Sequence, residues 1–82
     1  MSNKSYIINS LKKRHQLYTG LHDEQIKKDH LWVLKHPLKG SVKKEWTDFG
    51  VNLIMSEMGL DQRSAEIEMS FLEHEYESLA SR

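Results

Sequence analysis

The chain has 82 residues, enough for one small domain, and only 38% of them are apolar, which predicts a thin hydrophobic core. It has no cysteine, which excludes disulfide bonds, and no stretch approaches the roughly 20 apolar residues of a membrane-spanning helix. The formal net charge is zero, but the two halves of the chain carry opposite net charges. Residues 1–44 carry ten basic and three acidic side chains, whereas residues 45–82 carry two basic and nine acidic ones.

The first predicted helix covers residues 5–19. Its apolar and aromatic side chains recur every three or four residues, so they share one helix face: Ile7, Ile8, Leu11, His15 and Tyr18. Asn3 or Ser5 is a suitable cap for the start of this helix. Gly20 suits the left-handed residue that often follows a helix.

The second predicted helix covers residues 22–35. Two acidic residues in its first turn stand four positions before lysines, and this order stabilises a helix. Its predicted apolar stripe consists of Ile26, His30, Val33 and Leu34. Pro37 disfavours helical geometry at His36, so we expect the helix to stop there.

The third predicted helix covers residues 42–58, with Ser41 as its cap and Gly59 at its end. Its stripe follows a 4, 3, 4 spacing through Val42, Trp46, Phe49 and Leu53. Gly50 lies in the middle of the pattern, although glycine costs up to about 1 kcal/mol relative to alanine there. Either Gly50 permits the close approach of another helix, or it is neutral variation.

The fourth predicted helix covers residues 62–80 and begins after Asp61, a good capping residue. Its stripe follows a heptad-like spacing through Ala65, Met69, Leu72, Tyr76 and Leu79. Ile67 and Phe71 form a second, adjacent stripe. A helix with two stripes covers a core with one and presents the other outward.

These patterns predict a single all-α domain over residues 1–82, a small four-helix fold. No run alternates long enough to predict a strand. The short connection between the last two helices predicts a C-terminal antiparallel hairpin. Because the core is thin, dimerisation is one way to complete it.

Candidate catalytic and metal-binding residues are few. The five histidines include no pair at the i, i+3 or i, i+4 spacing of a helical zinc site, so they are interpreted as structural or surface residues. Ser70 and His74 stand four apart on the last helix, but a solvent-facing helix offers no cleft to exclude water. The sequence therefore predicts a protein without enzymatic activity, cofactor or metal.

The divided charge favours binding to another protein or to a second copy of the chain. We expect an acidic contact surface on the last helix, at Glu66, Glu73 and Glu77, and a complementary basic one at Lys12, Lys13 and Arg14. Trp32 lies off its helix stripe and is a candidate aromatic anchor, or else a core residue. The N-terminus does not resemble a signal peptide, so a small cytoplasmic regulator, adaptor or inhibitor is predicted.

Nucleic-acid binding is the alternative. The second and third predicted helices resemble a helix-turn-helix, with Lys43, Lys44 and Thr47 at the front of the recognition helix. Against this, the acidic last helix repels a duplex unless it faces away, and residues 35–44 contain no arginine for bidentate base readout.

Overall fold

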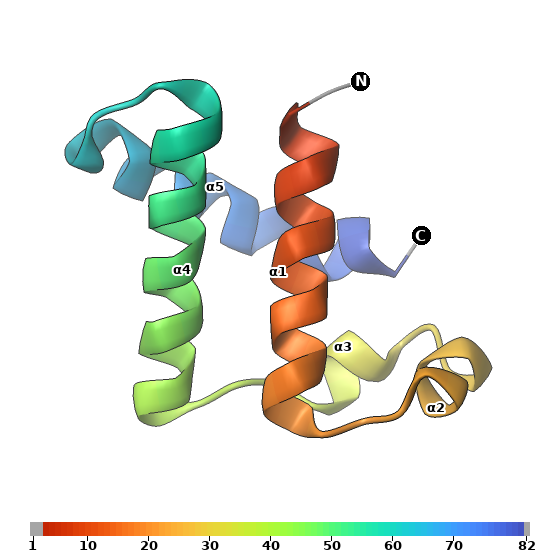
Figure 1. Ribbon diagram of the computed structural model, residues 1–82. Coiled ribbons are helices and arrows are strands. Elements are labelled where there is room, and N and C mark those ends of the chain that lie inside the picture. The colour runs from red at the N-terminus through yellow and green to blue at the C-terminus, as the bar shows by residue number, and fades with distance from the viewer. Residues whose placement is uncertain (1–2, 82) are drawn as a thin grey trace.

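The computed structural model describes residues 3–81, which form five α-helices and no strand (Figure 1). The all-α prediction is confirmed. The helices are α1 (Asn3–Thr19), α2 (Asp23–Lys28), α3 (Trp32–Lys35), α4 (Gly40–Met58) and α5 (Gln62–Ala80).

Two long helices, α1 and α4, lie side by side in opposite directions, and α5 crosses behind both (Figure 1). Hydrogen bonds near both ends join the antiparallel pair, from Asn3 Nδ2 to the Glu57 carbonyl at 3.0 Å and from Tyr18 to Glu45 at 3.3 Å. The short helices α2 and α3 lie at the end of α1 that leads into them (Figure 1). The molecule therefore has an α1–α4 layer and an α5 layer.

The ends of α4 and α5 follow from local chemistry. Gly59 adopts a left-handed conformation, with φ of 66°, and its N–H donates to the Met55 carbonyl, as predicted for a helix-ending glycine. Asp61 then caps α5, because its Oδ1 accepts a hydrogen bond from the Ser64 N–H at 2.9 Å. The start of α4 differs from the prediction: it begins at Gly40, two residues earlier, with Lys39 as its N-cap.

The prediction of one helix over residues 22–35 is wrong, because this segment forms α2 and α3 with a break between them. Asp29 at the break has an extended backbone, and its Oδ1 accepts the Leu31 N–H at 3.1 Å while its Oδ2 pairs with Lys35 at 2.7 Å. An aspartate that bonds nearby backbone competes with helical hydrogen bonding. The break turns Trp32 and Val33 into the core.

The core fills the space between the α1–α4 layer and α5. The helices α4 and α5 meet in an antiparallel sense, since Trp46 contacts Tyr76 and Gly50 faces Met69. On α5, four residues of the predicted stripe are buried and Leu79 is only partly buried. The buried face of α4 differs from its predicted stripe, because Phe49 and Leu53 are only partly buried and Gly50 is buried. The buried hydrophobic residues are Ile7, Ile8, Leu11, Trp32, Val33, Trp46, Val51, Ile54, Ala65, Met69, Leu72, Tyr76 and Ala80.

Candidate protein-binding surface

The outward face of α5 carries two large apolar side chains. Ile67 and Phe71 are 54% and 62% exposed, while the other stripe of the same helix is buried from Ala65 to Tyr76. They stand four residues apart, so they are neighbours on one helix face. The predicted second stripe is therefore present and points to solvent.

Two rows of glutamates flank this apolar pair. Glu66, Glu73 and Glu77, spaced seven and four apart, lie along one side of it, and Glu68 and Glu75 lie along the other. The first row borders α4, because Glu73 contacts Thr47 and Lys43, and the second borders α1, because Glu75 contacts Lys4. We call this set the acidic α5 surface: Glu66, Ile67, Glu68, Phe71, Glu73, Glu75 and Glu77.

The basic half of the chain neutralises this surface only in part. Lys4 lies 3.0 Å from Glu75, and Lys43 lies 3.8 Å from Glu73. Within residues 3–81, Glu66 and Glu77 have no ion pair and are exposed, and Glu68 has no ion pair either. Because three of the five glutamates of this surface have no ion pair within the described residues, the surface keeps a net negative charge.

The predicted basic residues lie on α1 but do not form one compact patch. Because consecutive helical residues project about 100° apart, Lys12, Lys13 and Arg14 point in three directions. The Arg14 guanidinium lies 4.3 Å from the ring centre of Phe49 on α4, a cation–π contact. Lys13 is exposed on the outward side of α1.

Trp32 is a core residue, and the anchor hypothesis needs correction. Its side chain is 2% exposed, and its ring centre lies 4.9 Å from that of His15. The break at Asp29 turns α3 so that Trp32 faces inward, whereas a continuous helix over residues 22–35 would have placed it beside the stripe. A buried indole cannot serve as a surface anchor.

His15 is the buried polar residue at the centre of an aromatic cluster with Trp32, Trp46 and Tyr76. Its Nε2 lies 2.7 Å from the His36 carbonyl oxygen, which only accepts, so Nε2 carries the hydrogen. Its Nδ1, 3.1 Å from the Tyr76 hydroxyl, then accepts the hydroxyl hydrogen. Burial lowers the pKa of His15 and also raises the pKa of Tyr76. The cluster therefore favours the neutral form of the His15 imidazole.

This cluster predicts a loss of stability in mild acid. Because the pKa of His15 is lowered on folding from its ordinary value of 6.5, the unfolded chain binds more protons than the folded one below that pH. The contribution of neutral His15 to the free energy of unfolding is fully present above pH 6.5. It decreases as the pH falls and becomes constant below the pKa of His15 in the folded state. We expect the urea midpoint to decrease between pH 8 and pH 5.

The control for this acid effect is another histidine. His15→Gln should have a lower urea midpoint at pH 8, but its midpoint should decrease less between pH 8 and pH 5. His30→Gln, at an exposed position, should show the same decrease in urea midpoint as the original chain. An equal acid loss in His15→Gln would contradict the assignment.

The three residues of the nucleic-acid alternative lie in the first turns of α4. Lys43 lies 4.9 Å from the ring centre of Trp46 and 3.8 Å from Glu73, and the Thr47 hydroxyl donates to the Lys43 carbonyl at 2.9 Å. The Glu73 carboxylate is also 3.3 Å from the Thr47 hydroxyl. Of the three, only Lys44 is exposed, whereas Lys43 and Thr47 are half-buried and lie beside Glu73 of α5.

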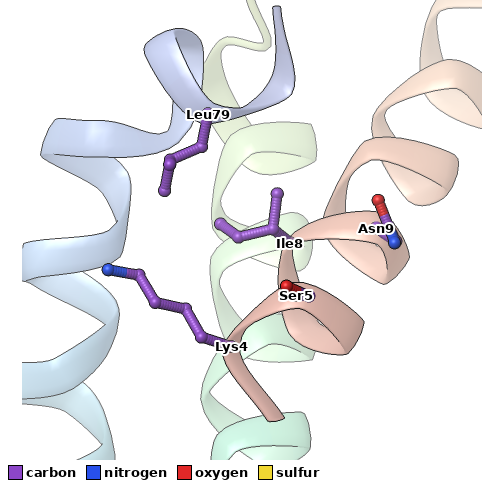
Figure 2. Close-up of a pocket in the computed structure, with 5 residues that line it drawn as sticks. All are labelled: Lys4, Ser5, Ile8, Asn9 and Leu79. Carbon is purple, nitrogen blue, oxygen red and sulfur yellow. The ribbon is translucent and has the colours of Figure 1, made fainter. Parts of the chain in front are cut away.

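A hollow of about 280 Å³, lined by both polar and apolar side chains, lies where the start of α1 meets the end of α5 (Figure 2). Lys4, Ile8 and Leu79 border it (Figure 2). Sequence reasoning did not find this hollow, because its walls come from opposite ends of the chain. Within residues 3–81, no group of three or more histidine, aspartate or glutamate side chains is arranged to hold a metal ion.

No helix in the described part of the chain is both long enough and apolar enough to span a membrane. Comparison with protein-family models, curated proteins and solved structures finds no match to the chain.

Proposed function

We propose that the chain is a non-enzymatic protein–protein interaction module, and that its acidic α5 surface binds a basic amphipathic segment of a partner protein. The observation that supports this most is the exposure of Ile67 and Phe71 between two rows of glutamates. Exposed aromatic and aliphatic side chains supply affinity when a partner covers them, and charges at the rim set orientation and association rate. In a cytoplasmic setting, such a module acts as an adaptor or an inhibitor by occupying a surface.

The charge of the surface selects the partner. Two α5 helices packed face to face would bring Ile67 and Phe71 together, but the flanking glutamates of both copies would then oppose each other. Like charges across an interface cost several kcal/mol. A helix with leucines on one face and lysine or arginine beside them satisfies both the apolar pair and the acids.

A basic amphipathic peptide tests the proposal directly. Titration of the isotope-labelled protein with a designed helical peptide, with leucines at i and i+4 and flanking lysines, should shift the amide signals of residues 63–78. Phe71→Ser should weaken binding about tenfold or more, since a central aromatic contact contributes more than 1 kcal/mol. A peptide with glutamates in place of its lysines should not bind.

The matched control is Leu34→Ser, which alters a 47% exposed leucine on α3 and should leave the peptide affinity unchanged. The proposal fails if Phe71→Ser binds like the original chain, or if the peptide shifts signals of α2 and α3 instead. Nucleic-acid binding is tested with a duplex at low salt, where phosphate contacts are strongest. Duplex binding that Lys44→Glu abolishes and Phe71→Ser leaves intact would favour the alternative.

A further inference from the structure

The outward face of α1 is the chemical complement of the acidic α5 surface. It carries two exposed apolar side chains, Tyr6 at 54% and Leu17 at 74%, in one row with Ser10 and Lys13 at spacings of four, three and four. Arg14 lies beside this row, whereas Lys12 projects toward the side of Ile8, and α1 contains no acidic residue. We call this set the basic α1 surface: Tyr6, Ser10, Lys13, Arg14 and Leu17.

The two surfaces of one molecule cannot meet. The α1 residues that contact α5 or line the hollow beside it include Lys4, Ile8 and His15, and helix periodicity places these opposite Tyr6, Lys13 and Leu17. Ile67 and Phe71 likewise point away from the core. Since α5 runs behind α1 (Figure 1), the basic α1 surface and the acidic α5 surface face opposite sides of the molecule.

From this opposition we infer that the acidic α5 surface binds the basic α1 surface of a second copy, so that molecules associate head to tail. The inference rests on the proposed function and names its partner as this chain itself. Basic side chains accompany two exposed apolar residues on α1, and acidic side chains flank two on α5, which favours this pairing over a two-fold α5–α5 contact. A contact between two different surfaces leaves one free at each end, so longer assemblies form as the concentration rises.

Glu45 on α4 is an acid close to the basic α1 surface, and the Tyr18 hydroxyl donates a hydrogen bond to its carboxylate at 3.3 Å. Because this donor is neutral, Glu45 keeps its negative charge and offsets part of the positive charge of Lys13 and Arg14. The Arg14 guanidinium keeps its charge while it lies over Phe49. The charged rims are exposed, so salt should screen them and weaken association.

Complementation between two variants tests the inference. Sedimentation of the original chain from about 10 µM to 1 mM, the range of weak complexes, should give a mass that rises with concentration. Leu17→Ser removes the more exposed apolar side chain of the basic α1 surface, and Phe71→Ser removes that of the acidic α5 surface. Each variant alone should associate at least about tenfold more weakly. An equal mixture should form a dimer that grows no further, because each variant keeps one intact surface.

Leu34→Ser is the matched control, because this exposed leucine of α3 lies outside both surfaces, and it should associate like the original chain. Circular dichroism of each variant checks that it remains folded. A monomeric original chain, association that survives Leu17→Ser, or a mixture without a dimer would each overturn the inference. If the original chain stays monomeric but binds the basic peptide through α5, the inference fails and the proposed function stands. If neither occurs, both fail.

Discussion

Replacing Trp46 by alanine is expected to lower the free energy of unfolding by about 3–5 kcal/mol, the range for deleting a buried large aromatic side chain. Trp46 is 2% exposed and joins all three long helices. Its Nε1–H donates to the Leu11 carbonyl of α1 at 2.9 Å, and its ring meets that of Tyr76 on α5 edge to face, with the ring centres 5.0 Å apart. Urea unfolding at pH 7.5 measures the loss.

A loss of this size is large for the whole domain. An 82-residue chain has a typical unfolding free energy of about 4–12 kcal/mol, so the alanine variant should be partly unfolded at 37 °C. Trp46→Phe is the control, because it keeps an aromatic ring and loses the N–H donor, and we expect a loss of about 1–2 kcal/mol. Equal losses in the two variants would show that the ring packing against Tyr76 contributes little.

The sequence predicts α5 almost completely, because its signals are local. Asp61 caps the helix through a hydrogen bond three residues away, and the buried stripe repeats with helical spacing. Ile67 and Phe71 fall outside that stripe, so their exposure follows from periodicity alone. The apolar pair of the acidic α5 surface can therefore be predicted from the sequence alone.

The break between α2 and α3 could not be predicted in this way. The apolar pattern of residues 22–35 suits a continuous helix, but Asp29 bonds the Leu31 N–H and the Lys35 ammonium instead. The break is favoured by a tertiary contact, because it allows Trp32 to be buried against His15 on α1. A pattern within one segment contains no information about that contact.

The remaining differences also come from contacts between distant segments. The sequence divides charge between its halves, but it does not say which acids meet lysines, and Lys4 and Glu75 pair across 71 positions. The face of α4 that is buried depends on where α5 crosses it. Gly50 shows this most directly, because sequence reasoning left its role open.

Gly50→Val is expected to destabilise the domain by about 3 kcal/mol, at the upper end for overpacking a core. A Cβ atom at Gly50 would lie 2.5 Å from Sδ of Met69 and 3.1 Å from Cδ2 of Leu11, so α1, α4 and α5 all approach this position. Met69 is 1% exposed and cannot move to solvent without opening the core. Valine adds two further carbons to the overlap. Asn52→Val, at an exposed position two residues away, should cost less than about 0.7 kcal/mol.

A double-mutant cycle with Met69→Ala identifies the cause. Met69→Ala alone leaves a cavity and should cost about 2–5 kcal/mol. In the Gly50→Val background the valine fills part of that cavity, and the shorter alanine side chain removes the overlap with Met69 Sδ. The double variant should therefore be at least about 1 kcal/mol more stable than the sum of the single losses predicts. Additive losses would mean that the crossing of α4 and α5 does not depend on the missing side chain at Gly50.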